Sequence, residues 1–276
     1  MGDGLLSGLE SFGLSGLEGM NLFEEEKKAE AQKEENQPTE KDFLLDKTMT
    51  CPICDAVFKA KTVKVGKAKL IRSDKDLRPV YKELDTLKYD VFMCPSCGYT
   101  ALSRYFPGIL QMQRQRIREK ITPAFKAKTD NPEIYTYDDA IERYKMALAN
   151  AVVKGTKASE IAYICLKSSW VVRGKAEELG STHPDYAKTK AMEAEFTKNA
   201  YEGFVKAVSA ESFPMCGMDE YTVDYLLAVL GIKTGHIDIA QKMIVAILQS
   251  QTASSRMKDM ARDLKEEIAK LPKQNQ

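Results

Sequence analysis

Four cysteines in two matching turns are the residues of this sequence best suited to chemistry. Cys51-Pro-Ile-Cys54 and Cys94-Pro-Ser-Cys97 each place two thiols at C-x2-C spacing, and 39 residues separate the two turns. Two such turns placed face to face supply four thiolates in a tetrahedron, which is the arrangement of a structural zinc site. The pattern therefore predicts one structural Zn²⁺ per chain, with Cys51, Cys54, Cys94 and Cys97 as its ligands.

A centre with four thiolate ligands is closed, because no position remains for a substrate or a water molecule. We therefore expect the metal to stabilise the fold instead of catalysing a reaction. The alternatives are two unrelated pairs of buried cysteines, or a redox role for either C-x2-C pair. Redox motifs of this spacing normally lie beside a βαβ unit, and neither pair has that context here.

The stretch "RSDKDLRPVY", residues 72–81, is a possible functional loop. Asp74 and Asp76 flank a lysine, and two carboxylates so close in sequence could bind a hard cation or act as acid and base. The residues of interest in this loop are Asp74, Asp76, Arg78 and Tyr81. The alternative is a structural loop whose carboxylates cap backbone groups and pair with Arg72 or Arg78.

A run of basic residues follows the first cysteine pair. Between Val57 and Ser73 there is no acid, and six bases occur: Lys59, Lys61, Lys64, Lys67, Lys69 and Arg72. Further on come Arg114, Arg116, Arg118 and Lys120. Such a surface could lie on a phosphate backbone, which makes nucleic acid a possible partner. The alternative is a strand whose alternating lysines form its solvated face.

Residues 43–107 are predicted to be β-rich. "TVKV" at 62–65, "KAKLIR" at 67–72 and "YDVFMC" at 89–94 mix β-branched and apolar residues with charges at strand-like spacing. Gly66 separates the first two and suits a hairpin turn. The segment between the cysteine pairs is long enough for a three-stranded sheet.

From Pro107 onward the apolar residues recur at helical spacing, and Pro107 can open the first helix. Further helices are expected over residues 137–151, 158–179, 186–210, 219–233, 237–250 and 254–271. Three of them carry the same pattern: an alanine, a large residue four positions later, and a further packing residue three positions after that. This spacing resembles that of the second helix of a tetratricopeptide repeat. The residues are Ala140, Tyr144 and Ala147; Ala200, Phe204 and Ala207; and Ala240, Ile244 and Ile247. The intervals of 60 and 40 residues between the alanines depart from the repeat's 34, so a plain helical bundle stays an alternative.

Composition bounds the class of protein. The chain has 276 residues, of which 43% are hydrophobic and 29% charged, and these fractions are typical of a globular protein. Residues 1–42 combine a Gly/Leu stretch with an acidic one and are predicted to be a disordered tail. The alternative is that the Leu, Phe and Met residues at 5–23 form a short amphipathic docking segment. No apolar run reaches the roughly 20 residues of a membrane span, and the N-terminus does not read as a secretion signal. We expect a cytoplasmic location, where thiols stay reduced.

Together these features resemble a bacterial family catalogued as domain of unknown function 2225. The likeness covers about residues 45–271 and is strongest at 51–106. It rests on Cys51, Pro52, Cys54, Asp74, Asp76, Leu77, Pro79, Tyr81, Tyr89, Asp90, Val91, Cys94, Pro95, Cys97, Gly98, Tyr99 and Ala101. The resemblance implies a zinc-bearing module joined to a helical repeat-like domain in a bacterial cytoplasm, and it supplies no substrate and no catalytic residue.

The predicted fold class is α+β, in three parts: a disordered acidic tail (1–42), a zinc-ribbon-like domain (43–107) and an α-helical tetratricopeptide-like domain (108–276). The predicted function is that of a zinc-binding, non-enzymatic adaptor whose helices bind a protein or peptide. One alternative is a nucleic-acid-associated regulator that uses the basic segment. Another is an enzyme with a site at the domain junction, including Asp74, Asp76 and Tyr81.

Overall fold

The structure, a computed structural model, describes residues 38–127 and 132–270. The chain divides into two units, residues 1–42 and 43–276. Most of the predicted disordered tail, residues 1–37, lies outside the described residues. A short 3-10 helix, η2, spans Glu40–Phe43, and all the elements below belong to the second unit.

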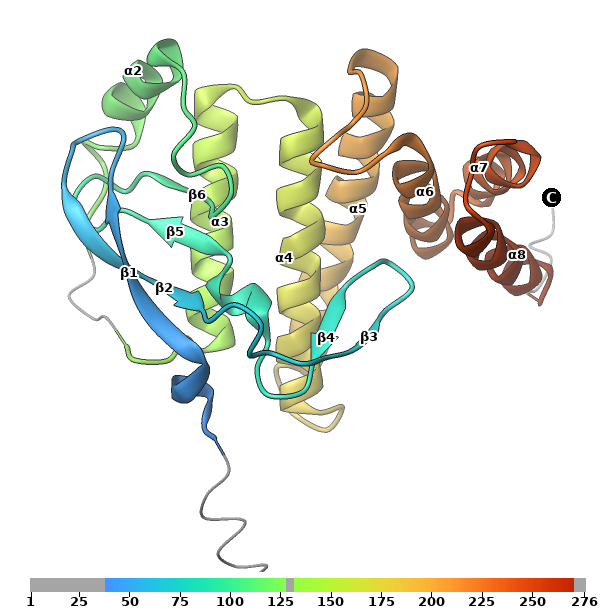
Figure 1. The fold of residues 1–276 in the computed structure, drawn as a ribbon, viewed down its shortest axis with the longest axis horizontal. Helices are drawn as coiled ribbons and strands as arrows, with labels where there is room; N and C mark the ends of the chain where they lie inside the picture. The colour runs from blue at the N-terminus through green and yellow to red at the C-terminus, as the bar shows by residue number, and fades with distance from the viewer. Residues whose placement is uncertain (1–37, 128–131, 271–276) are drawn as a thin grey trace, which may run out of the picture. The chain divides into compact units, whose positions relative to one another are not determined.

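Strands come first in the second unit and helices follow (Figure 1). The strands form three antiparallel pairs: β1 (Leu44–Thr50) with β2 (Val57–Val63), β3 (Leu70–Ser73) with β4 (Pro79–Tyr81), and β5 (Val91–Met93) with β6 (Thr100–Leu102). A 3-10 helix, η3 (Thr86–Tyr89), precedes β5. The helices are α2 (Gln111–Lys120), α3 (Tyr137–Lys154), α4 (Ala158–Leu179), α5 (Tyr186–Ala210), α6 (Glu220–Thr234), α7 (Ile237–Gln249) and α8 (Ser255–Lys270). The predicted α+β class is confirmed.

The strand pairing differs from the prediction. Gly66 does lie in a turn, with φ of 71°, but the strands on its two sides do not pair with each other. β2 pairs instead with β1, from Leu44 opposite Val63 to Thr50 opposite Val57. The prediction of a three-stranded sheet is also wrong, because each sheet in the described residues has two strands. The cysteine turn at 51–56 joins β1 to β2 as a hairpin, so the partner of β2 lies before it in the chain and not across Gly66.

The start of the first helix after the strands was also predicted wrongly. Pro107 lies in a turn in which the Gly108 N–H donates to the Tyr105 carbonyl at 3.2 Å. α2 begins four residues later, where the Leu110 N–H donates to the side chain of Gln113 at 3.2 Å. A proline fixes φ in a range that suits turns as well as the first position of a helix, so its presence alone did not decide between them.

Helices α3 to α8 pack mainly on their neighbours in sequence, and Figure 1 shows α3, α4 and α5 side by side. The nine residues of the small-large pattern on α3, α5 and α7 are all at most 2% exposed, and they belong to two buried clusters that the helices share. The assignment of these helices as tetratricopeptide-like stays a prediction. Among the helices within residues 38–127 and 132–270, none has the length and apolar character that a membrane span requires.

The strand-bearing segment and the helices share a core. Leu87 of η3, Val91 of β5 and Leu102 of β6 belong to the same buried cluster as Tyr144 of α3 and residues of α4 to α6. A second cluster surrounds the cysteines and includes Ile117 of α2, and a third joins α6, α7 and α8. Segments on both sides of the predicted domain boundary at residue 107 therefore pack together, and that boundary stays a prediction.

Candidate metal centre and neighbouring sites

The four cysteines of the two C-x2-C turns lie together. All four Sγ atoms are within 4.8 Å of one another, with 3.6 Å between those of Cys51 and Cys97 and 3.6 Å between those of Cys54 and Cys94. A tetrahedral zinc ion with Zn–S bonds of about 2.3 Å places its sulfurs about 3.8 Å apart. The cluster therefore fits such an ion and could hold a metal.

The two cysteine turns have equivalent backbones. Each occupies a six-residue connection at the tip of a hairpin, 51–56 between β1 and β2 and 94–99 between β5 and β6. In each turn the residue after the second cysteine donates its N–H to the carbonyl of the first cysteine, at 3.0 Å from Asp55 and 3.1 Å from Gly98. Both donors have left-handed φ angles, 59° and 74°. Glycine and aspartate tolerate this conformation better than most residues, so the same turn forms twice.

Helices α2 and α3 hold the carbonyl groups of these turns. The Asn150 side chain of α3 donates to the Gly98 carbonyl at 3.2 Å, and Nε of Arg118 in α2 donates to the Ile53 carbonyl at 3.0 Å. A Cβ atom on Gly98 would lie 2.5 Å from two ring atoms of Phe125. One cysteine turn is therefore fixed against each helix, and Gly98 leaves no space for a side chain.

The crowding of the thiols opposes their joint ionisation. Hydrogen bonds from Cys51 and Cys97 lower the pKa of the Cys94 thiol. Hydrogen bonds to Cys51 and Cys94, together with burial, raise the pKa of Cys97. A divalent metal ion removes this opposition, because a coordinating thiol is deprotonated outright.

The loop singled out in the sequence is fastened to the helices. Asp76 is 1% exposed, and its carboxylate accepts hydrogen bonds from Arg173 of α4, at 3.1 Å to Oδ1, and from Lys233 of α6, at 2.5 Å to Oδ2. Both guanidinium NH₂ groups of Arg78 donate to Glu177 of α4, at 2.9 and 2.8 Å. These contacts place Asp76 and Arg78 in ion pairs that bind the loop to α4 and α6.

The electrostatics of Asp76 follow from these contacts. Burial alone would raise its pKa, but the hydrogen bonds and charges of Arg173 and Lys233 outweigh burial and hold the pKa well below its usual range. The carboxylate therefore stays ionised and fully engaged. Asp74 lies 3.4 Å from Arg72, 3.7 Å from Arg78 and 3.2 Å from Arg173.

The middle of the loop adds an apolar anchor. Leu77 has a left-handed φ of 67°, a conformation that costs about 1–3 kcal/mol for a residue other than glycine. Its side chain packs against the cluster of α3 to α6 and also against that of α6 to α8. Lys75 reaches α8, where it pairs with Glu267 at 2.6 Å. Tyr81 is half-buried and pairs with Leu70 across the β3–β4 hairpin.

Several of the basic residues between positions 57 and 120 have structural partners. Arg116 donates to the carbonyl of Lys154 at the end of α3, at 3.1 Å, as Arg118 does to the first cysteine turn. Lys59 donates to Thr48 at 2.6 Å, and Lys61 pairs with Asp46 at 3.2 Å across the β1–β2 hairpin. These contacts reduce the number of cations available to a phosphate backbone, and nucleic-acid binding stays a prediction.

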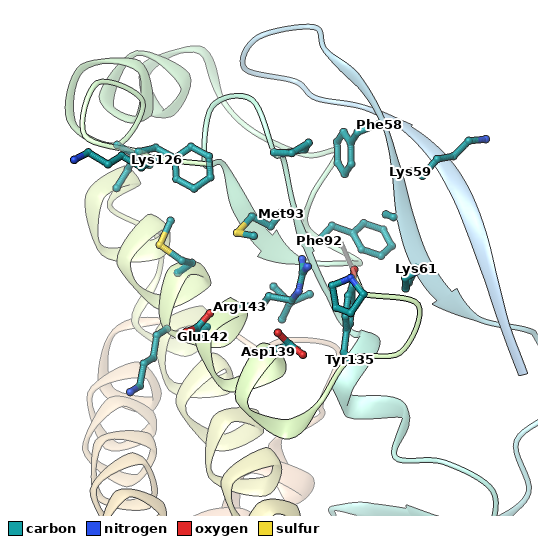
Figure 2. A pocket seen from close by; sticks show the side chains of 18 of the residues that line it. Phe58, Lys59, Lys61, Phe92, Met93, Lys126, Tyr135, Asp139, Glu142 and Arg143 are labelled. Carbon is teal, nitrogen blue, oxygen red and sulfur yellow. The ribbon is translucent and has the colours of Figure 1, made fainter. Parts of the chain in front are cut away.

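A cavity of about 930 Å³ lies beside the second cysteine turn, between β2, β5, the end of α2 and the first half of α3 (Figure 2). No pattern in the sequence predicted it. Its labelled aromatic residues, Phe58, Phe92 and Tyr135, come from segments far apart in the chain and share no motif. Only the packing of the hairpins on α3 brings them together.

Comparison with known proteins places the chain in a family. No curated protein and no solved structure matches it. One family model matches residues 44–268, more than half of the chain, and its description is "uncharacterized protein conserved in bacteria". The chain therefore belongs to this bacterial family, domain of unknown function 2225.

Proposed function

We propose that this protein is a zinc-stabilised adaptor, and not an enzyme, whose helical array binds an extended segment of another protein. The observation that carries the proposal is the path of residues 74–78, which we call the docked segment. It contacts three alternate helices of the array: Asp76 pairs with α4 and α6, and Lys75 pairs with α8. Alternate helices of such arrays commonly line one binding face.

The docked segment contacts these helices in the way a bound peptide would. A carboxylate lies in a cationic notch formed by Arg173 and Lys233, and the next residue, Leu77, supplies an apolar anchor between two clusters. Charge-assisted hydrogen bonds give such a contact direction, and the apolar anchor gives it burial. A partner segment with Asp followed by a large apolar residue would meet the same groups.

The proposed zinc centre has a structural part in this function. Cys51, Cys54, Cys94 and Cys97 would hold one Zn²⁺ in a closed site, which stabilises a fold without performing a reaction. The ion would tie β1–β2 to β5–β6 and so fix both ends of the chain that carries the docked segment. Elemental analysis of the purified chain should find about one zinc per molecule. Cys94→Ser should lower that content and Cys216→Ser, outside the cluster, should not.

Peptide binding tests the adaptor role. The probe is a fluorescein-labelled peptide with the sequence of residues 73–79, titrated against the full chain and followed by fluorescence anisotropy. The wild type should bind it weakly, because its own segment occupies the site. Asp76→Ala with Leu77→Ala should free the site and tighten binding, and adding Lys233→Ala should weaken it again. Equal binding of a scrambled peptide by the released variant would sink the proposal.

A further inference from the structure

The cavity beside the second cysteine turn carries a chemical signature of its own. It shares no residue with the docked segment, so a ligand site there is independent of the adaptor proposal. Its volume of about 930 Å³ falls within the range of roughly 300–1,000 Å³ seen for small-molecule sites. The chemistry of its walls decides which class of molecule it would hold.

The inner wall is apolar. Val91 and Phe92 of β5 and Ala60 of β2 are buried at 2%, 5% and 5% exposure. Phe58 and Met93 add an aromatic ring and a thioether beside them (Figure 2). Such walls favour an apolar body, since burial of apolar surface contributes about 25 cal/mol per Å².

One cation in the lining is held in place and yet lacks a polar partner. The guanidinium of Arg143, on α3, lies over the ring of Tyr135 at 4.0 Å from its centroid. Within the described part of the chain it forms no hydrogen bond and no ion pair. A guanidinium has five N–H donors in a planar fork that matches carboxylate and phosphate groups, so Arg143 offers a ready anion site.

The acids of the lining do not satisfy Arg143. Asp139, one turn away on α3, accepts hydrogen bonds from the N–H and hydroxyl of Thr136 at 2.9 and 2.6 Å and so caps its own helix. Glu142 is engaged in another contact. The lining holds six basic and two acidic residues in all. One of the six, Lys61, pairs with Asp46, and the positive excess that remains favours an anion.

From the apolar wall, the stacked Arg143 and the positive lining we propose that the cavity binds a small amphipathic anion, a molecule with an apolar body and a carboxylate or phosphate head. The head would pair with the Arg143 fork, and the body would lie against Phe58, Phe92 and Met93. Both head groups share the chemistry that Arg143 recognises, and the experiment distinguishes them.

Isothermal titration of the full-length, zinc-loaded protein tests the proposal with three probes that share a ten-carbon chain: decanoate, decyl phosphate and decanol. We expect decanoate or decyl phosphate to bind one per chain with a Kd between about 10 and 100 µM, and decanol to bind at least about 10-fold more weakly. The tighter of the two anions identifies the head group. Decanol binding as tightly as both anions would overturn the anion site.

Two variants and a local readout complete the test. Arg143→Met should weaken binding of the anions at least about 10-fold without changing that of decanol, and Arg256→Met, at an exposed position of α8, should change neither. In methyl NMR spectra, the anion should shift Met93 and Met146, which line the cavity, and leave Met112 of α2 in place. The proposal is overturned if neither anion binds at concentrations up to about 1 mM, or if Arg143→Met binds the anions as tightly as the wild type does. It is also overturned if the methyl signals of Met93 and Met146 do not shift when the anion is added.

Discussion

Gly98→Ala is the substitution whose cost the structure defines most closely. Gly98 follows the last cysteine of the cluster, has φ of 74°, and would direct a Cβ atom to 2.5 Å from Cγ and Cδ2 of Phe125. The backbone has little freedom to move away. The Gly98 carbonyl accepts hydrogen bonds from the Thr100 hydroxyl at 3.0 Å and from Asn150 at 3.2 Å.

Two costs add in this variant. An alanine with left-handed φ is destabilised by about 1 kcal/mol relative to glycine. Forcing Phe125 out of its place is an overpacking cost of about 1–3 kcal/mol, so the free energy of unfolding should fall by about 2–4 kcal/mol. Gly66→Ala is the matched control, because Gly66 has φ of 71° and no atom within 4 Å of the added Cβ. It should lose only the first cost, about 1 kcal/mol.

Urea unfolding followed by far-UV circular dichroism gives the free energy of unfolding of each variant. The values can be compared when the slopes of that free energy against urea concentration agree between the variants and the wild type. Zinc content should be measured on each sample by elemental analysis, so that a lost ion is not read as a lost contact. A loss in Gly98→Ala no larger than in Gly66→Ala, at equal zinc content, would refute the close approach of Phe125 to the second cysteine turn.

Two carboxylates give further predictions, with opposite signs. Asp76→Asn should lower the free energy of unfolding at pH 7 by about 3–5 kcal/mol, because it breaks a buried ion pair, whereas Asp259→Asn, in an exposed pair with Arg262, should stay within about 0.5 kcal/mol. The folded-state pKa of Asp76 is depressed. The stability that its carboxylate contributes is therefore fully present above the unfolded-state pKa of about 3.9 and is lost progressively as pH falls from there toward the folded-state pKa. Urea titrations in which the effect of Asp76→Asn persists undiminished at pH 3 would contradict this. Burial, aided by Glu220, raises the pKa of Asp224 to about 6. The folded state therefore favours the protonated form, and Asp224→Asn should stabilise the protein by about 1–3 kcal/mol at pH 8 and hardly at all near pH 4. A thermal shift that is the same at both pH values would show that the carboxyl is not the cause.

Local patterns in the sequence predicted the helices well, because the signals lie within each helix. The bounds of α4 and α5 agree with the predicted 158–179 and 186–210. Apolar periodicity runs the length of each, and α4 ends before Gly180, a residue with φ of 75°. The spacing of the four cysteines likewise predicted a cluster, and their Sγ atoms do lie together.

Such local patterns could not predict which distant segments of the chain pair with each other. The sequence offered Arg72 and Arg78 as partners for the loop carboxylates because they are near in the chain. The main partners of Asp76 are Arg173 and Lys233, 97 and 157 residues away. The turn at Gly66 shows the same limit, since a left-handed glycine defines a turn without deciding which strands pair across it. Arg143 and the cavity gave no local signal at all.

The separation of Asp76 from Lys233 also has a consequence in time. A ribosome adds roughly 5–20 residues per second, so the 157 residues between them take roughly 8 to 30 s to synthesise. During that interval the docked segment has been made, while its partner helix α6 is not yet complete. Both cysteine turns are already available to a metal ion by then, because residue 97 follows Asp76 closely in the chain. Binding of the proposed metal ion by the two cysteine turns would thus hold together the two ends of the chain that carries the docked segment before α6 is complete.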